Sequence, residues 1–188
     1  MTRSIDLGSD LGEGLPDDEA LLRIVTTAHV SCGRHAGSAA LTARTIALAR
    51  ECGVTVGAHP GYDDPANFGR LPLALSRDAL VAMIRLQLED FVGLAGGPVA
   101  MVKAHGALYN QGERDDAVAA AIVEAIVGSG AAGAIVATPG SAMARAAAGV
   151  SVTSPFGTGT PWPARIRLAW YSWIFIVGLC PVPGGRVE

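Results

Sequence analysis

Ionisable and polar side chains in this sequence cluster where short apolar segments end. One such segment is MVKAHGALYN, residues 101–110, which begins as an apolar strand and then carries lysine, histidine, tyrosine and asparagine. In parallel β/α folds the carboxyl ends of the strands meet at one ligand-binding edge. We therefore predict that four separate segments bring together Asp10, Glu13, Cys32, His35, His59, Asp63, Asp64, Lys103, His105, Tyr109 and Asn110.

Two kinds of chemistry fit this set of residues. Imidazole and carboxylate groups bind zinc, iron or manganese, and such an ion activates water. The candidate metal ligands are Asp10, His35, His59 and His105. Alternatively, Asp10 or Glu13 acts as a general base on water. Lys103 or His105 then stabilises an oxyanion, as amide hydrolysis requires. The spacing does not choose between these, since the sequence has no HExxH or GxSxG motif.

Lys103 is the most informative single residue. It ends a strand as apolar as VAMV, where a lysine is costly to bury unless it is paired or used, and desolvation would lower its pKa. Side chains alternate along a strand, so Lys103 and His105 are expected to face the ligand together. Ala104, between them, is expected to face the helical layer.

Length and composition restrict the class of protein. The chain has 188 residues, half of them hydrophobic and 16% charged, with a net charge of −3, which fits one globular domain. No basic surface suggests nucleic acid or an anionic membrane as a partner. Three dispersed cysteines without a CxxC motif argue against a disulfide framework and favour a cytoplasmic location. We predict no signal peptide and no transmembrane helix.

Two kinds of segment alternate along residues 1–153. Short apolar or β-branched runs, typical of strands, lie at 4–7, 26–31, 54–59, 99–105, 133–138 and 149–153. Helical periodicity and start signals mark 16–25, 38–52, 76–95, 115–129 and 141–148. This alternation predicts an α/β fold with a parallel sheet, either open or closed into a barrel. No GxGxxG or Walker A motif follows any of the predicted strands, which counts against the nucleotide-binding open sheets.

Four motifs together resemble the LamB/YcsF family, the A subunit of prokaryotic 5-oxoprolinase. They are DLGSDLGEG, TTAHVSCGRHAG, GVTVGAHPGYDDPANFGR and MVKAHGALYN, and the resemblance extends over about residues 3–150. It implies a distorted, seven-stranded β/α barrel of the TIM-like type found in sugar deacetylases. It also implies ATP-dependent opening of the lactam 5-oxo-L-proline to L-glutamate, with Mg²⁺ accompanying ATP at the level of a complex with B and C subunits.

The resemblance also assigns roles to residues. The residues implied to be catalytic are Asp10, Glu13, His35, His59, Lys103 and His105. Those implied to bind substrate are Cys32, Asp63, Arg70, Tyr109 and Asn110, although Asp63 and Asp64 also fit a simple loop-capping role. The chain departs from the family pattern at Gly8, His29 and Arg34, where the family usually carries Asn, Asn and Phe. The last two departures are expected to add bulk or positive charge beside the pocket.

The β/α rhythm stops at about Ser154. Residues 154–188 contain all three tryptophans and no acidic residue before Glu188. We therefore assign residues 1–153 to a barrel that is incomplete at its C-terminus and 154–188 to an atypical tail. Two interpretations of the tail stay open, an unusual extension that packs apolar residues onto the barrel and, the one we favour, the product of a frameshifted or truncated gene. Two other functions stay open, a metal-dependent deacetylase-like carbohydrate hydrolase and an inactive scaffold subunit.

Overall fold

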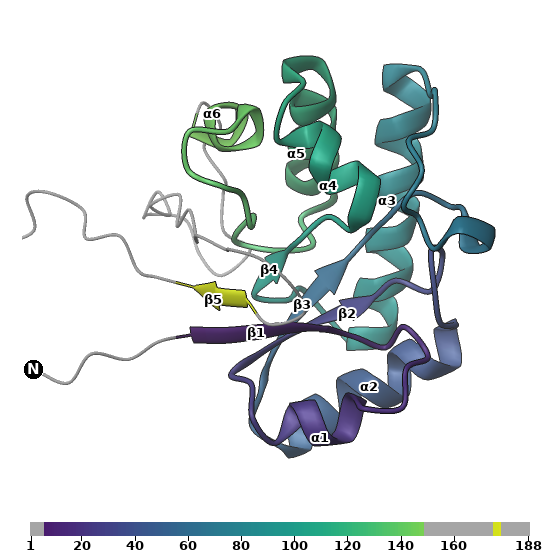
Figure 1. Cartoon of the computed structure of the whole chain (residues 1–188), viewed down its shortest axis with the longest axis vertical. Coiled ribbons are helices and arrows are strands. Elements are labelled where there is room, and N and C mark those ends of the chain that lie inside the picture. The colour runs from purple at the N-terminus through teal and green to yellow at the C-terminus, as the bar shows by residue number, and fades with distance from the viewer. Residues whose placement is uncertain (1–5, 149–174, 178–188) are drawn as a thin grey trace, which may run out of the picture.

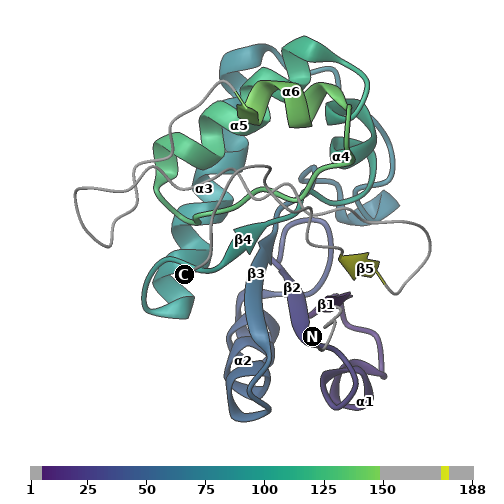
Figure 2. The ribbon, with the colours of Figure 1, turned by 90° about the vertical axis from the view of Figure 1, so that its left-hand side faces the viewer.

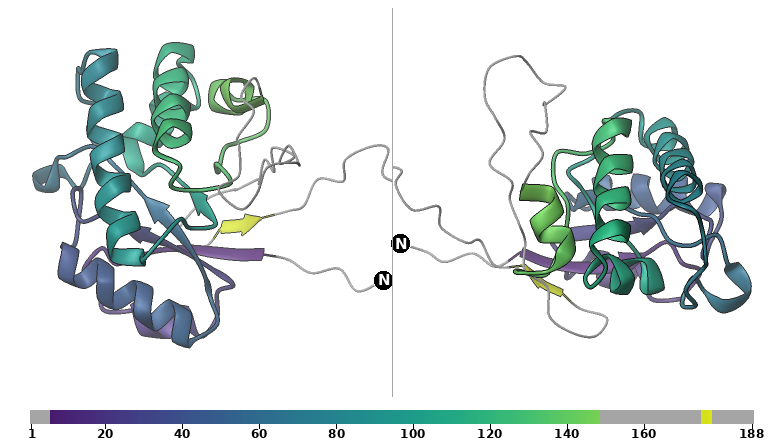
Figure 3. Two further views of the ribbon diagram at one scale, coloured as in Figure 1. Left: turned by 180° about the vertical axis from the view of Figure 1, so that it is seen from behind. Right: turned by 90° about the horizontal axis from the view of Figure 1, so that it is seen from above.

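A curved sheet forms the centre of the protein. The computed structural model describes residues 6–148 and 175–177. Strands β1 (Asp6–Leu11), β2 (Thr27–Ser31), β3 (Thr55–His59) and β4 (Met101–Val102) are parallel neighbours in chain order. Strand β5 (Phe175–Val177) pairs with β1 in the antiparallel direction, as Figure 3 shows from behind. Figure 1 shows the five strands together.

Helices connect the parallel strands and pack against one another in sequence order. They are α1 (Asp18–Leu22), α2 (Ala39–Glu51), α3 (Arg77–Ala95), α4 (Gly106–Gly112), α5 (Asp116–Ser129) and α6 (Ala142–Ala148), with a 3₁₀ turn at Pro65–Asn67. Helix α2 contacts α3, α3 contacts α5, and α5 contacts α6 (Figure 2). None of these described helices is both long and apolar enough to cross a membrane.

The helix starts follow from local side-chain chemistry. Ser38, Ser76 and Asp115 each stand just before a helix, and their side chains accept hydrogen bonds from backbone N–H groups of its first turn. Such N-caps satisfy donors that the helix itself leaves unpaired. The start signal predicted at Ser76 is confirmed, and the long helices end within one residue of their predicted limits.

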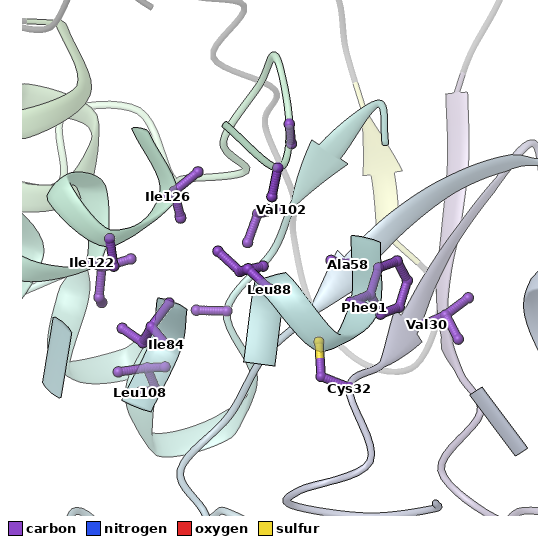
Figure 4. Close-up of a cluster of buried hydrophobic side chains, with 14 of the residues drawn as sticks. Val30, Cys32, Ala58, Ile84, Leu88, Phe91, Val102, Leu108, Ile122 and Ile126 are labelled. Atoms are coloured by element: carbon purple, nitrogen blue, oxygen red, sulfur yellow. The ribbon is translucent and has the colours of Figure 1, made fainter. Parts of the chain in front are cut away.

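A continuous hydrophobic core joins the helices to one face of the sheet. Figure 4 shows side chains of α3 and α5 packed with those of the strands, and the labelled residues are Val30, Cys32, Ala58, Ile84, Leu88, Phe91, Val102, Leu108, Ile122 and Ile126. Because strand side chains alternate, the neighbours of Val30, Ala58 and Val102 along the chain face the other side of the sheet. That second face is polar, and it carries the candidate site.

The α/β class with a parallel sheet is confirmed, with local differences from the predicted segments. The run at 133–138 is not a strand but forms isolated bridges at Ile135, which pairs with Val102, and at Val136, and helix α4 was not predicted. The described strands number five, not the seven of the expected barrel. The run at 149–153 and the predicted boundary at Ser154 lie outside the described residues, and the described part of the tail is β5.

Two leucines on helix α3 provide a test of this core. Leu88 is fully buried and Leu86 is 51% exposed. We expect Leu88→Ala to lower the free energy of unfolding by about 2–5 kcal/mol, because it leaves a cavity between helix and sheet. Leu86→Ala, the matched control, should change it by less than about 0.5 kcal/mol. Urea denaturation measures both, and equal losses would contradict this packing.

Candidate active site

The polar face of the sheet gathers side chains from all four parallel strands or their ends. Asp10 of β1 is in register with His29 of β2, and His29 with Gly57 of β3. Beyond Val102 the chain still follows β3, since the Lys103 N–H donates to the Ala58 carbonyl and the His105 N–H to that of Pro60. Lys103 and His105 therefore project to the same face as Asp10, while Ala104 packs in the hydrophobic core, as predicted.

Asp10 and Lys103 form a buried ion pair across this face. Lys103 Nζ donates to both Asp10 carboxylate oxygens, at 2.7 and 2.8 Å. Burial alone would raise the pKa of Asp10, but His59 and Lys103 outweigh it and hold this pKa well below its usual range. Burial lowers the pKa of Lys103, and the Asp10 carboxylate opposes that shift. The pair thus keeps one carboxylate and one ammonium group charged at a site with little water.

This ion pair also shows that the sheet is curved. Strands β2 and β3 lie between β1 and β4, so in a flat sheet the two backbones would be about 14 Å apart. Side chains stand roughly perpendicular to a sheet and would not meet over that distance. The contact therefore requires a curved sheet whose concave face holds both residues.

Glu13 meets three histidines directly beside the ion pair. Its Oε1 lies 3.2 Å from His35 Nε2, 3.8 Å from His59 Nε2 and 3.3 Å from His105 Nδ1. The four donor atoms all lie within 4.8 Å of one another, and the four side chains are buried. The structure thus groups Glu13 with the histidines as possible metal donors. Asp10, the predicted carboxylate ligand, pairs with Lys103 and also approaches His59 Nε2, at 3.3 Å.

His29 belongs to the same face, although the search of strand ends did not select it. It lies in mid-strand, is fully buried, and neither ring nitrogen has a hydrogen-bond partner among the residues that the structure describes. A Cβ at Gly8 would lie 3.0 Å from Nε2, and one at Gly57 would lie 3.2 Å from Nδ1. Glycine at both positions leaves the space that the ring fills. Its departure from the family pattern predicted added bulk beside the pocket, and alternation within TTAHVS, together with Gly8 in the neighbouring strand, would have placed it on this face.

Arg70 and Asp63 lie at the exposed rim of this cluster. Arg70 stacks over the Phe68 ring, with its guanidinium carbon 5.0 Å from the ring centroid. Arg34 approaches Asp63 at 3.9 Å and Asp90 at 3.1 Å. The positive charge expected from Arg34 is therefore balanced by two carboxylates.

The other predicted substrate-binding residues are dispersed. The Tyr109 hydroxyl is hydrogen-bonded to the Thr138 hydroxyl at 3.0 Å, and burial raises the pKa of Tyr109. Asn110 follows it on α4 and is exposed. Cys32 packs in the hydrophobic core beside the sheet, and burial raises the pKa of its thiol well above the usual range. An uncharged thiol in an apolar environment is suited to packing.

Comparison with known proteins identifies the family of this chain. The model of the LamB/YcsF family matches residues 5–155, most of the sequence and nearly all of the described sheet. The chain belongs to the LamB/YcsF family. The resemblance predicted from four motifs is thereby confirmed.

A solved structure of similar fold supports the LamB/YcsF assignment. It is the crystal structure of the lactam utilization protein from Thermus thermophilus, which is 34% identical, with a TM-score of 0.72. The match covers 78% of this LamB/YcsF chain and 62% of the Thermus chain, so this chain spans less than two thirds of that protein. The polar face, with Asp10, Glu13, His35, His59, Lys103 and His105, lies within the segment that the family model matches.

The Asp10–Lys103 pair allows a test by double substitution. Lys103→Met removes the ammonium partner of the buried Asp10 carboxylate, so we expect a loss of about 3 kcal/mol in unfolding free energy. Adding Asp10→Leu removes that carboxylate and should restore most of that loss. Arg44→Ala, which breaks an exposed ion pair with Glu19, is the control and should cost less than about 1 kcal/mol. Additive losses in the double variant would show that the two residues do not interact.

His29 should make stability dependent on pH. Burial, followed by the nearby Lys103 charge, lowers its pKa from 6.5 to about 3. Between these values the unfolded chain binds a proton that the folded chain excludes, so stability is full above 6.5 and falls as the pH decreases. His29→Gln should reduce the slope of unfolding free energy by about 1.4 kcal/mol per pH unit in this window. Equal slopes for parent and variant would contradict the prediction.

Proposed function

We propose that this chain is the A subunit of an ATP-dependent 5-oxoprolinase, which opens the lactam 5-oxo-L-proline to L-glutamate. The observation that carries the proposal is the buried set of Asp10, Lys103, Glu13 and three histidines on the concave face of a LamB/YcsF chain. The Thermus protein of similar fold, named for lactam utilization, supports a lactam as substrate.

The chemistry of the substrate explains a need for ATP. A five-membered lactam resists hydrolysis, because amide resonance makes its carbonyl carbon a poor electrophile and its nitrogen a poor leaving group. Phosphorylation of the amide oxygen, with release of ADP, makes that carbon easier for water to attack. The ring carbon–nitrogen bond then breaks, and a second water releases phosphate to leave the glutamate side-chain carboxylate.

Asp10 and Lys103 suit the water-addition step. The Asp10 side chain is 22% exposed, whereas that of Lys103 is 5% exposed, so the carboxylate is the more accessible member of the pair. Asp10 accepts a proton from the attacking water, and the Lys103 ammonium group stabilises the negative charge that develops on oxygen. His59 Nε2 borders this carboxylate at 3.3 Å. Arg70, at the rim, is suited to an anionic group of substrate or phosphate.

The complete enzyme in this proposal contains more than this chain. B and C subunits join it in the cytoplasm, and ATP with Mg²⁺ binds at the level of that complex. The fold of the family is the distorted seven-stranded β/α barrel, of which the four parallel strands form one part. Asp63, Tyr109 and Asn110 then lie on loops and a helix at the carboxyl ends of the strands, where substrate would enter.

A second function is favoured by one observation. The spacing of Glu13 and the three histidines suits a metal ion, and a metal-dependent deacetylase-like hydrolase needs such a site. That enzyme would cleave an acetamide without ATP and without B and C subunits. Activity of the isolated chain towards acetylated sugars would favour it over the oxoprolinase.

Single substitutions in the assembled complex test the oxoprolinase. Co-expressed A, B and C subunits should form glutamate and ADP from 5-oxoproline and ATP. Lys103→Ala and His105→Ala should each lower kcat by about 10²–10³, since each removes a group beside the reacting atoms. Arg44→Ala, on the outer face of α2, should leave kcat unchanged. Full activity of both site variants would overturn the assignment, as would glutamate formation that is independent of ATP.

A further inference from the structure

Two of the histidines have their protons directed away from each other by backbone carbonyl groups. His59 Nδ1 lies 2.7 Å from the carbonyl oxygen of Lys103, and His105 Nε2 lies 2.9 Å from that of Phe68. A carbonyl oxygen only accepts, so both of these ring nitrogens must carry the hydrogen. The opposite nitrogens, His59 Nε2 and His105 Nδ1, are then bare in the neutral rings.

Those two bare nitrogens face each other. They are 3.0 Å apart, and Glu13 Oε1 lies 3.8 Å from the first and 3.3 Å from the second. Three lone-pair donors thus point into one buried space and cannot hydrogen-bond to one another. Such an arrangement needs a cation at its centre, either a shared proton or a metal ion.

The spacing of the donor atoms distinguishes these cations. Tetrahedral zinc with bonds of about 2.0–2.1 Å places its ligand atoms about 3.3–3.4 Å apart. The separations from Glu13 Oε1 are 3.2 Å to His35 and 3.3 Å to His105, which match that value, and 3.8 Å to His59, which is longer, and all four donor atoms lie within 4.8 Å of one another. A shared proton would join only the two nitrogens of His59 and His105. A metal ion accounts for the convergence of all four donor atoms, including His35 Nε2, which is hydrogen-bonded to Glu13 Oε1 at 3.2 Å.

The backbone around His105 supports the same interpretation. Phe68, whose carbonyl accepts from His105, has φ of +57° and is the one residue other than glycine with positive φ in the described part of the chain. A bulky aromatic residue rarely adopts this conformation, and it persists where the surrounding structure requires it. Outer hydrogen bonds of this kind fix the tautomer of a metal-binding imidazole.

We propose that Glu13, His35, His59 and His105 bind one divalent first-row transition-metal ion, with zinc the best fit. Three imidazole nitrogens and one carboxylate oxygen form a donor set that zinc prefers. Asp10 borders this site, since its Oδ2 lies 3.3 Å from His59 Nε2. The site goes beyond the proposed lactam chemistry and does not rest on it, because its argument uses only donor atoms and tautomers.

The composition of the chain allows a direct test. All four histidines of the sequence lie on this face, and three of them are proposed ligands. In full-length protein labelled with ¹⁵N-histidine and stripped of metal, added Zn²⁺ should shift the ring nitrogens of His35, His59 and His105. His29, with no part in the site, is an internal control and should move least. Elemental analysis should give one zinc per chain.

Substitutions complete the experiment. Glu13→Gln and His59→Gln should each weaken zinc binding by more than about 100-fold, since loss of a ligand should exceed the 10–100-fold cost of losing an outer-shell partner. His29→Gln, a matched change of a buried histidine, should bind zinc as the parent does. Far-ultraviolet circular dichroism of the metal-free variants separates lost binding from lost folding.

Two results would overturn the site. One is the absence of zinc uptake by folded parent protein, with ¹⁵N shifts that show a proton shared by His59 and His105. The other is equal loss of zinc from His29→Gln and Glu13→Gln. Neither result would affect the oxoprolinase proposal, which is measured as ATP-dependent glutamate formation by the complex.

Discussion

The buried contact between Asp10 and Lys103 is the constraint on which the rest of the structure depends. It joins the first and fourth strands of a parallel sheet across two intervening strands. A contact of this kind requires the sheet to curve, and curvature gives the sheet two unlike faces. The convex face takes small and branched apolar side chains against the helices, while the concave face collects the ionisable ones.

Charge balance explains why these groups are tolerated in the interior. The Asp10 carboxylate neutralises the Lys103 ammonium group, and the pair lies directly beside Glu13 and the histidines. Burial lowers the pKa of His105 to about 3, and proximity to other imidazoles further favours its neutral form. A neutral imidazole keeps a lone pair available, which a base or a metal ligand requires. Burial and the neighbouring imidazoles thus keep His105 neutral, so that it can act as a base or as a metal ligand.

The supporting residues show how closely the concave face is packed. Gly8 and Gly57 make room for His29, and the unusual backbone of Phe68 directs a carbonyl group at His105. Membership of the LamB/YcsF family and similarity to a lactam utilization protein give this arrangement a chemical context. A lactam carbonyl is a small, neutral group, and a compact, water-poor site with fixed charges is suited to polarising it.

The local pattern of the sequence determined the helices and strands and many of the candidate site residues. Periodicity, and a capping residue such as Ser76, predicted the long helices, because these signals act within one turn of the chain. The rule that strand ends meet predicted that Asp10, Glu13, His35, His59, Lys103 and His105 converge, and they do.

Only the tertiary structure decided how these residues are paired. Sequence reasoning placed Asp10 among the metal ligands and Cys32 at the substrate, whereas curvature brings Asp10 to Lys103 and alternation turns Cys32 into the core. The strand-end rule also did not select His29, which only its departure from the family pattern placed beside the pocket, since the space for its ring is made by glycines on two other strands. Pairing depends on distances of a few ångströms between strands far apart in sequence, and no local pattern encodes those distances.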